Sequence, residues 1–547
     1  MAFEPVSVIW PDNRVLCLDR DLLVIDKPWG LPVYGGHVAV DDIVTRLRRW
    51  LRSQDEPDYL ALHQRLDRDA SGVMLFVRNR DLNPIFARAF RDHAVDRHYV
   101  AVVKDEGLPQ HLLMVDQIQP AAKGPSRVVA SGGLRAEADL HVVSRHGGLA
   151  LVELQPRTGR RHQLRLQLAH RRAAIVGDAL YGGLPGPRLM LHAKELGIAA
   201  ANRRFVAKVP LEISNWQNMQ GLGTAGRIRQ ALIDSAQRRA PWFSQNSTAF
   251  RLVNDGGDGL AGVRIDRFGD WAVIELAEPE AIDRRDELAQ AVSRWDCRGV
   301  YVKCRPRADL RLRDAEELAP AGPVFGEPAP NTFIVNEGEL RFEVSLSDGW
   351  DTGLYIDQRE NRQRVLRAAK GKRVLNLFSY TCSFSVAAAM GGAETTTSVD
   401  LSRRALNRGN RNFLLNGIEP SSRHRLLRAE ATQFARRACA RGDEFDLVIL
   451  DPPSFATIGK GHVFRLEKEW DSLIELAITL LAKGGQCLLV SHEVPERARL
   501  LRQRTSALVR KAGRTSTGLR DLASNTDCPA QRDKPFPSRS LWLSLES

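Results

Sequence analysis

The chain lacks long apolar runs, and its cysteines are few and show no disulfide or zinc-binding pattern. None of its 547 residues lies in an apolar run near the roughly 18 residues that a membrane helix needs. The first residues, Met1 to Pro5, lack the basic and apolar parts of a signal peptide. The seven cysteines include no Cys-x-x-Cys pair, which argues against a disulfide framework and against a zinc site. We therefore expect a cytoplasmic protein without membrane spans or metal, whose cysteines are buried thiols.

Charge is the main compositional signal. A hydrophobic fraction of 43% and a charged fraction of 27% are typical of globular proteins, and the length predicts three or four domains. The net charge of +13 favours polyanionic partners, although arginine used only for solubility would give the same sum. The basic residues gather in two groups, which we interpret as RNA-facing patches. One group comprises Arg157, Arg160, Arg161, Arg165, Arg171 and Arg172, and the other comprises Arg403, Arg404, Arg408, Arg411, Arg423, Arg425 and Arg428.

The pattern along the chain predicts three folded parts. Residues 219–229 are rich in glycine and lack apolar periodicity, as in a linker. Before them, residues 1–218 form one domain. Residues 230–328 contain strand and helix patterns, including a hairpin over 263–276 and a helix near 279–294, and form a small α+β accessory module that binds RNA. Residues 329–547 alternate strands and helices, which predicts a Rossmann-like domain. The fold class is therefore multidomain α/β and α+β.

The octet at 65–72 carries the first candidate site. It places Asp67 between Arg65 and Arg68, directly before an apolar strand-like run at 73–77. Neighbouring guanidinium groups favour the ionised form of a carboxylate, which can then act as a nucleophile or a base. Arginine forks also suit phosphate. The alternative is a surface turn with a local ion pair.

Three further segments form an ordered pattern together with the octet. Together with the segments at 26–33, 156–166 and 175–182, it resembles the ordered motifs of RluA-type pseudouridine synthases, over about residues 22–216. The resemblance implies a mixed-sheet domain that needs no cofactor. It implies that Asp67 is the catalytic carboxylate, that Tyr99 stacks under the target uridine, and that Arg165 pairs with the carboxylate. The implied RNA-binding residues are Arg65, which holds the base out of the stack, Arg68, Arg160 and His162.

Three positions depart from that family pattern. His63 lies one place too far from Asp67, Ala70 replaces a usual threonine, and His98 replaces a usual lysine before Tyr99. None removes a group that the chemistry requires. They nevertheless keep open a second hypothesis, in which the front half is a catalytically quiet RNA clamp in an assembly factor.

The back half predicts a nucleoside site. The pattern predicts a strand at 373–378, followed by a turn at 379–381 and a helix from 384. A second strand then ends in Asp400. An acid at this place binds ribose hydroxyls. The absence of Gly-x-Gly-x-x-Gly argues against a dinucleotide, so S-adenosylmethionine is favoured over the nicotinamide of an oxidoreductase. A third strand, at 445–450, runs into Asp451-Pro452-Pro453, where a methyl acceptor would lie.

The segments at 351–359, 376–381 and 396–402 resemble class I methyltransferases of large-subunit ribosomal RNA, and the similarity covers about residues 228–547. It implies S-adenosylmethionine as the cofactor, and ribosomal RNA, naked or in early assembly particles, as the partner. Asp451 is the implied catalytic residue. The implied cofactor-binding residues are Asp357, Gln358, Arg359, Asn376, Phe378, Tyr380, Thr381, Asp400, Leu401, Glu430, Asp451, Pro452 and Pro453.

The methylated atom depends on one position. Methylation of cytosine C5 needs a thiolate, which relatives carry at the end of the strand after the Gly-Gly turn. Here His492 stands at that position and Cys487 lies within the strand, so C5 is disfavoured. Guanine N7 needs only alignment and is the expected atom, with an exocyclic amine as a third option. The expected protein is a bifunctional enzyme that isomerises uridine and methylates a base of large-subunit ribosomal RNA.

Overall fold

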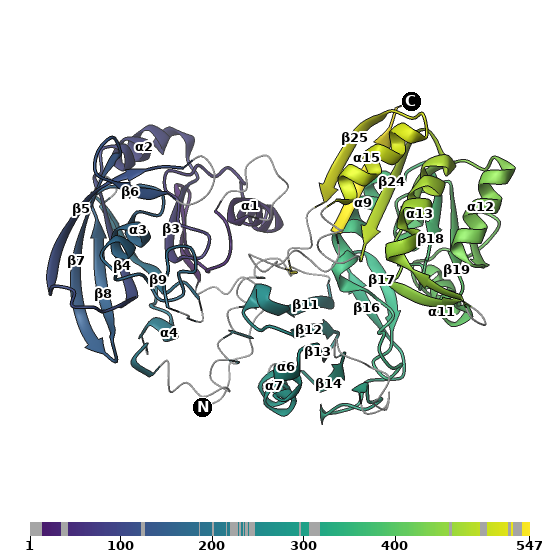
Figure 1. Ribbon diagram of the computed structural model, residues 1–547, viewed down its shortest axis with the longest axis horizontal. Helices are drawn as coiled ribbons and strands as arrows, with labels where there is room; N and C mark the ends of the chain where they lie inside the picture. The colour runs from purple at the N-terminus through teal and green to yellow at the C-terminus, as the bar shows by residue number, and fades with distance from the viewer. Residues whose placement is uncertain are drawn as a thin grey trace. The chain divides into compact units, whose positions relative to one another are not determined.

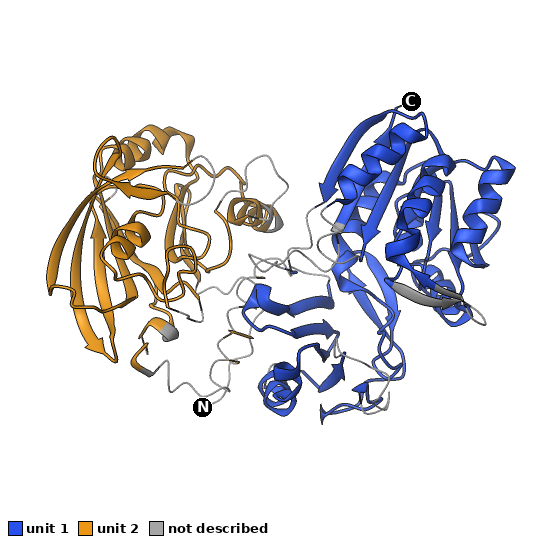
Figure 2. Cartoon of the chain, viewed as in Figure 1, with its two compact units in different colours: residues 1–3, 245–547 blue, residues 4–244 orange. Residues whose placement is uncertain are grey.

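The structure is a computed structural model with two compact units, residues 4–244 and residues 245–547 together with 1–3 (Figure 2). It describes residues 14–33, 42–121, 126–184, 186, 188–199, 202–214, 216–218, 228, 231–232, 235, 239, 247–294, 297–305, 318–458, 462–492, 500–522, 527–528 and 539–546. Apart from Ile228, the predicted linker at 219–229 lies outside the described residues. The domain boundaries at 218, 230 and 328 remain predictions.

The first unit is built on one mixed sheet of ten strands, as the sequence predicted (Figure 1). The strand order is β1-β2-β3-β9-β4-β8-β7-β5-β6, with β10 paired to β9, and only β3 and β9 run parallel. The strands are β1 (Val15–Leu18), β2 (Leu22–Lys27), β3 (Ser71–Val77), β4 (Val95–Lys104), β5 (His111–Gln119), β6 (Arg127–Val129), β7 (Leu134–His146), β8 (Leu149–Pro156), β9 (Leu191–Ile198) and β10 (Arg203–Val206). The helices are α1 (Ile43–Ser53), α2 (Asn83–Arg91), α3 (Gln163–His170) and α4 (Leu211–Ser214).

Strand β3 is apolar on both faces because both faces are covered. Met74 and Phe76 pack with Leu47 of α1, whereas Val73, Leu75 and Val77 pack with Phe86 of α2. All seven residues of β3 are buried, as is usual for a strand between two layers. The strand therefore gives a rigid support to the loop with Asp67 that precedes it.

The second unit begins with a five-stranded sheet in the order β11-β12-β13-β14-β15, and the predicted hairpin is present in it. Its strands are β11 (Ala249–Asn254), β12 (Val263–Phe268), β13 (Trp271–Leu276), β14 (Gly299–Cys304) and β15 (Phe325–Gly326). The expected single helix near 279–294 is two helices, α6 (Pro279–Ile282) and α7 (Arg285–Ser293). A separate hairpin of β16 (Phe333–Glu337) and β17 (Leu340–Val344) follows.

A seven-stranded sheet completes the second unit, with the order β20-β19-β18-β21-β24-β26-β25. The first five strands run parallel, and β26 is antiparallel to both neighbours. The strands are β18 (Arg373–Leu377), β19 (Thr395–Asp400), β20 (His424–Arg428), β21 (Phe445–Leu450), β24 (Leu481–Ser491), β25 (Ser516–Leu522) and β26 (Arg539–Leu545), with a hairpin of β22 (Phe455–Ile458) and β23 (His462–Arg465). The helices are α9 (Arg359–Ala368), α10 (Ser383–Met390), α11 (Arg403–Leu415), α12 (Ala431–Arg441), α13 (Leu466–Leu480) and α15 (Leu501–Lys511).

This sheet is covered by helices on both faces, which agrees with the predicted Rossmann-like domain. Val448 of β21 packs with Leu473 of α13, whereas Ile449 next to it packs with Val365 of α9. In a parallel sheet of this kind, ligands bind at the carboxyl ends of the strands. No helix among the described residues is long and apolar enough to cross a membrane.

All seven cysteines have free thiols. Cys304, Cys382, Cys487 and Cys528 are buried as expected, but Cys17, Cys297 and Cys439 are only half-buried. Within the described ranges, no three His, Cys, Asp or Glu side chains are grouped so as to hold a metal ion.

Candidate active sites

Asp67 is held by an arginine from a distant part of the chain. Arg165 of α3 donates from Nη1 to Asp67 Oδ2 at 3.1 Å. The same guanidinium donates from Nε and Nη2 to the two oxygens of Asp178, both at 2.7 Å. Burial alone would lower the pKa of Arg165, but the hydrogen bonds and charges of the two acids raise it above its ordinary value. A fixed cation thus lies beside the candidate catalytic carboxylate.

The arginines that adjoin Asp67 in sequence do not pair with it. Arg68 donates from Nε to the carbonyl of Gly30 at 3.0 Å, and Arg65 is exposed. The expected pairing with Arg165 is present, whereas the flanking guanidiniums are turned to other partners or to solvent. Sequence reasoning did not assign a role to Asp178, although it belongs to the third quoted motif.

His162 and Tyr181 lie on the other side of the carboxylate. His162 has a left-handed backbone with φ of 55° directly before α3, and its Nε2 lies 3.8 Å from Asp67 Oδ1. Its Nδ1 is 2.9 Å from the hydroxyl of Tyr181, whose ring centroid is 5.2 Å from Arg165 Cζ. Burial lowers the pKa of His162 despite the nearby acid, which favours the neutral ring at neutral pH.

Tyr99 belongs to the same site. It lies on β4, directly opposite Leu154 of β8, and its side chain is half-buried. Burial raises the pKa of its hydroxyl, and the negative charge of Asp67 adds to that shift. The ring is therefore a neutral platform close to the carboxylate, as a stacking role requires.

Lys27 holds the loop that carries Asp67 in place, although sequence reasoning assigned no role to this lysine. Its side chain is buried at the end of β2. Its Nζ donates to three carbonyl oxygens, those of Pro28 at 2.8 Å, Arg68 at 3.0 Å and Ala70 at 2.8 Å. Two of these acceptors follow Asp67 within three residues, so the side chain of Lys27 fixes the backbone of the loop.

The basic groups predicted from the sequence are only partly free. Arg157 pairs with Asp139, and Arg171 pairs with Asp116. In the second unit, Arg404 and Arg408 pair with Asp348, and Arg411 pairs with Glu343. Arg160 is half-buried and donates to the carbonyl of Arg135 at 3.0 Å, while Arg161 is exposed. Ion pairing thus weakens the positive charge that the sequence alone indicated.

The second site lies at the carboxyl ends of β18 and β19. Asp400 ends β19 and accepts hydrogen bonds from the backbone N–H groups of Tyr380 and Ser402, both at 2.8 Å. Phe378 and Tyr380 have positive φ values of 58° and 47°, so the chain turns sharply after β18. Burial raises the pKa of the Asp400 carboxyl although the backbone N–H groups oppose this. The turn thereby brings Asp400 against the loop at 378–381.

Buried polar atoms in this cradle fit a polar ligand. Asn376 donates from Nδ2 to Ser385, but its Oδ1 is buried without a hydrogen-bond partner among the described residues. The same is true of Nε2 of Gln358. An unpaired buried polar atom is costly, and a ribose or amino acid group would satisfy it. These residues therefore fit S-adenosylmethionine.

Other predicted cofactor residues have protein partners. Glu430 accepts from the N–H groups of Thr432 and Gln433, so it caps α12. Arg359 is buried and donates from Nη2 to Asp527 at 2.6 Å. The hydroxyl of Thr381 donates to the carbonyl of Gly353 at 2.7 Å, and Leu401 is exposed. The roles of these residues toward the cofactor stay predictions.

The Asp-Pro-Pro turn lies at the end of β21, where the sequence placed it. Asp451 is partly buried, with Pro452 buried and Pro453 exposed after it. Asp451 Oδ1 is 2.8 Å from Nε2 of His492, which follows β24. Burial opposes protonation of His492, but the hydrogen bond and charge of Asp451, with the charge of Asp357, raise its pKa overall. The pair therefore favours an imidazolium bound to a carboxylate.

No reactive thiol accompanies this pair. Cys487 lies within β24 opposite Val448, and burial raises the pKa of its thiol. Cys528 is close enough to Asp357 for the charges to interact, but burial and Asp527 raise the pKa of its thiol as well. Both thiols are protonated at neutral pH, which disfavours a nucleophilic cysteine.

Comparisons with known proteins agree with this division. The family model of RNA pseudouridylate synthases matches residues 21–170, and that of S-adenosylmethionine-dependent methyltransferases matches residues 310–505. Ribosomal RNA large subunit methyltransferase I of Erwinia tasmaniensis is 33% identical over 290 residues, 52% of this chain and 71% of that protein. The protein of the same name from Aeromonas hydrophila is 34% identical over 289 residues, with the same coverage.

A solved structure supports the same assignment. A protein titled a methyltransferase and complexed with SAH is 29% identical, with a TM-score of 0.51, and covers 58% of this chain and 81% of that one. Both enzyme domains are thus present in one chain, and S-adenosylmethionine is the cofactor of the second.

Proposed function

The chain belongs to the family of S-adenosylmethionine-dependent methyltransferases that includes ribosomal RNA large subunit methyltransferase I, and from this we propose a bifunctional RNA-modifying enzyme. Its first unit isomerises uridine to pseudouridine, and its second unit methylates a base, with guanine N7 as the atom. The substrate of both is large-subunit ribosomal RNA in the cytoplasm, naked or in early assembly particles. One docking event then serves two nucleotides through a raised effective concentration.

The observation that carries the isomerase proposal is the single carboxylate of Asp67 beside the doubly anchored Arg165. In the reaction, the bond between C1′ and N1 of uridine breaks and a bond between C1′ and C5 forms. The proton on C5 is lost to solvent and N1 gains one. Asp67 attacks the sugar or removes a proton, Arg165 keeps the carboxylate in place, and Tyr99 stacks on the extruded base.

The positions that depart from the family pattern leave this site intact. His63 Nε2 lies 3.2 Å from Asn83 Oδ1, and His98 lies 3.4 Å from Asp96, so both have other partners. Ala70 accepts a hydrogen bond from Lys27 through its backbone carbonyl, so this contact does not require a threonine side chain. These contacts favour an active front half over a quiet RNA clamp.

The methyltransferase proposal depends on Asp400 and Asp451, at the carboxyl ends of β19 and β21, the two strands that flank β18. S-adenosylmethionine supplies an electrophilic methyl group when it is bound. Asp400 binds the ribose hydroxyls. The Asp451–His492 pair positions the acceptor base, with the imidazolium donating from Nδ1 to a base oxygen such as guanine O6. The lone pair of N7 needs no thiolate, which suits a unit in which the thiols of Cys487 and Cys528 are protonated.

An exocyclic amine is the second candidate acceptor. The Asp451 carboxylate has a further oxygen lone pair that can accept the amine N–H and then its proton. Methylation of cytosine C5 is the less favoured alternative, because the thiols of Cys487 and Cys528 are protonated.

Two measurements test the proposal. Tritium release from C5-labelled uridine in ribosomal RNA should occur with the wild type and fall to background with Asp67→Asn. Equal background for both proteins would reject the isomerase. Mass spectrometry of ribosomal RNA from a deletion strain should lose one pseudouridine and one 7-methylguanosine. Loss of an N-methylated amine or of 5-methylcytidine would reassign the atom, and an unchanged map would reject both activities.

A further inference from the structure

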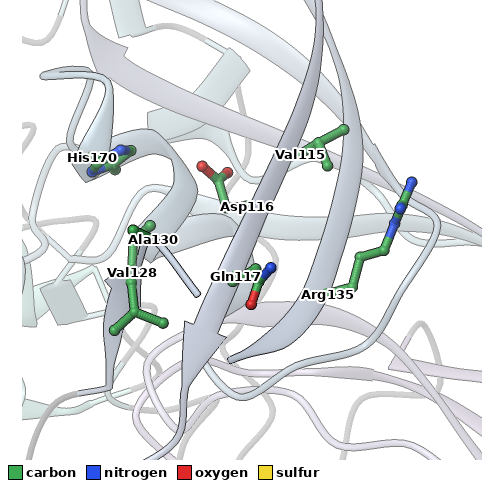
Figure 3. Close-up of a pocket in the computed structure, with 8 residues that line it drawn as sticks. Val115, Asp116, Gln117, Val128, Ala130, Arg135 and His170 are labelled. Carbon is green, nitrogen blue, oxygen red and sulfur yellow. The ribbon is translucent and has the colours of Figure 1, made fainter. Parts of the chain in front are cut away.

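A hollow at the edge of the first sheet is open on two faces. It has a volume of about 510 Å³, and its lining includes Val115, Asp116 and Gln117 of β5 and Val128 of β6 (Figure 3). Val128 pairs with Ile118, so it shares a face with Asp116, whereas Val115 and Gln117 lie on the opposite face. The hollow therefore spans the edge of the sheet instead of enclosing a ligand.

A cluster of three aromatic side chains lies beside the cofactor cradle of the second unit. The ring centroids of Tyr355 and Tyr380 are 5.4 Å apart, at an interplanar angle of 47°. Tyr380 is part of the cradle, since its backbone N–H donates to Asp400 at 2.8 Å. Trp350 belongs to the loop before Tyr355. Tyr355 itself is 48% exposed, so an aromatic surface is open to solvent next to the cofactor site.

Arg305 holds this cluster from the accessory sheet. It directly follows β14 and donates from Nη2 to the carbonyl of Trp350 and to Asp351 Oδ1, both at 3.0 Å. Its Cζ lies 5.4 Å from the centroid of the Trp350 ring. The hydroxyl of Tyr355 donates to the same Asp351 oxygen at 3.3 Å. The accessory sheet therefore fixes the segment that carries the Tyr355 ring.

The charge around the Tyr355 ring favours RNA over an apolar protein segment. Lys303, two residues before Arg305, is 2% exposed, and its Nζ has no hydrogen-bond partner among the described residues. Burial lowers the pKa of Lys303 to about 8, so the ammonium form predominates at neutral pH. The side chain of Arg305 is 35% exposed, and that of Arg404, which pairs with Asp348, is 75% exposed. An aromatic ring next to such cations suits an unpaired base and its phosphate.

The exposed ring lies near the proposed methyl acceptor but not at it. Tyr380 follows β18, whereas Asp451 follows the adjacent β21 and His492 follows β24, the next strand. Neighbouring strands are about 4.8 Å apart, so these positions are separated by about 5–10 Å. Asp357, two residues after Tyr355, is close enough for its charge to raise the pKa of His492. A base on Tyr355 is therefore a neighbour of the acceptor base and does not replace it.

We propose that Tyr355 stacks with an unpaired base adjacent to the methyl acceptor and that Arg305 binds the phosphate of that nucleotide, which selects the RNA for methylation. The proposal rests on RNA methylation by the second unit. The base places its π-face on the exposed ring, and the buried Lys303 behind Arg305 increases the positive potential. Stacking contributes to binding, so methyl transfer at Asp451 and His492 is unchanged.

Variants of the ring test the proposal. Tyr355→Leu removes the aromatic face, and Tyr355→Phe keeps this face but loses the hydrogen bond to Asp351. Phe325→Leu is the matched control, because Phe325 is an aromatic residue with the same exposure of 48%. It lies opposite Val300, about 16 Å along β14 from Arg305.

Transfer of a labelled methyl group to ribosomal RNA from a deletion strain measures the effect. Tyr355→Leu should raise KM for the RNA about tenfold, with kcat changed less than about twofold and the calorimetric Kd of S-adenosylmethionine unchanged. Tyr355→Phe and Phe325→Leu should match the wild type. Arg305→Gln should reduce the slope of log Kd for RNA against log salt concentration by about 0.7, the value for one phosphate contact on a single strand.

An unchanged KM for Tyr355→Leu would overturn the proposal, as would an unchanged salt slope for Arg305→Gln. Equal losses for Tyr355→Leu and Tyr355→Phe would also overturn it, because they would assign the effect to the hydrogen bond with Asp351. Weaker binding of S-adenosylmethionine by Tyr355→Leu would place the ring on the cofactor instead of on RNA. Absence of methyl transfer by the wild type would instead reject the methyltransferase activity itself.

Discussion

Two arginine–aspartate pairs of the first unit have the same two-bond geometry but differ in burial. Comparing them gives a controlled test of the role of Arg165. Arg165 meets Asp178 through two bonds of 2.7 Å, and Arg157 meets Asp139 through bonds of 2.7 and 3.0 Å. The side chains of the first pair are 3% and 0% exposed, and those of the second are 55% and 40% exposed. Breaking a buried pair costs about 3–5 kcal/mol because the remaining charge is unpaired.

We therefore expect Asp178→Asn to lower the melting temperature of the first unit by roughly 10 °C, since each kcal/mol is worth about 2–4 °C in a unit of this size. The asparagine can still accept from the N–H groups of Leu180 and Tyr181, so the turn itself should survive. Loosening of Arg165 should also reduce tritium release about tenfold, because its hydrogen bond to Asp67 is displaced. Asp139→Asn should change neither quantity.

Calorimetry of the full chain measures the first effect, and tritium release at saturating RNA measures the second. Methyl transfer by the second unit is the internal control and should be the same in both variants. Equal melting shifts for Asp178→Asn and Asp139→Asn would refute the burial argument. A destabilised Asp178→Asn with normal tritium release would show that Arg165 does not position Asp67.

Three further predictions concern both sites. Lys27→Met should abolish tritium release but not methyl transfer, because the carbonyl groups of Arg68 and Ala70 in the Asp67 loop lose their donor; normal release would contradict it. Asp400→Asn should weaken S-adenosylmethionine binding in calorimetry at least about tenfold with tritium release unchanged, and unchanged affinity would remove Asp400 from the site. The pKa of His492 is raised above its ordinary value of 6.5 in the folded protein. The charged pair with Asp451 is therefore fully present below pH 6.5, and it is lost as the pH rises through the pKa of the folded state. Methyl transfer should fall over that upper window, His492→Asn should flatten the profile, and a parallel profile in both proteins would exclude this pair.

Local patterns were sufficient to predict most elements of both sheets. The apolar run before Asp451 is β21, and the run after the Asp67 octet is β3, because two-sided burial requires continuous apolar sequence. The break between α6 and α7 was missed. Arg284 and its neighbours at the break continue the helical spacing, so no proline or glycine signals the break.

Ion pairing was the least predictable feature. Asp67 has arginines on both sides in sequence, yet its partner is Arg165, 98 residues away. Sequence proximity does not determine which guanidinium reaches a carboxylate, because the side chains of a loop diverge and only the tertiary fold brings α3 to β3. The same reason explains why the clustered arginines of α11 were interpreted as RNA-facing although Arg408 pairs with Asp348.

Buried polar contacts connect α9 with the segment around Asp527 and with the hairpin of β16 and β17, and one hydrogen bond extends to β11 of the accessory sheet. Asp527 accepts from the backbone N–H of Arg251 on β11 and from the guanidinium of Arg359 at the start of α9. Glu337 of β16 pairs with Arg362 one turn later in α9, with both side chains 1% exposed. Each acid has a buried cation as partner, and loss of either partner would leave an uncompensated charge. Since α9 begins directly after Asp357 and Gln358, Asp527 and the hairpin of β16 and β17 hold the segment predicted to cap the cofactor. The orientation of that cap therefore depends on pairs that lie outside the methyltransferase sheet itself.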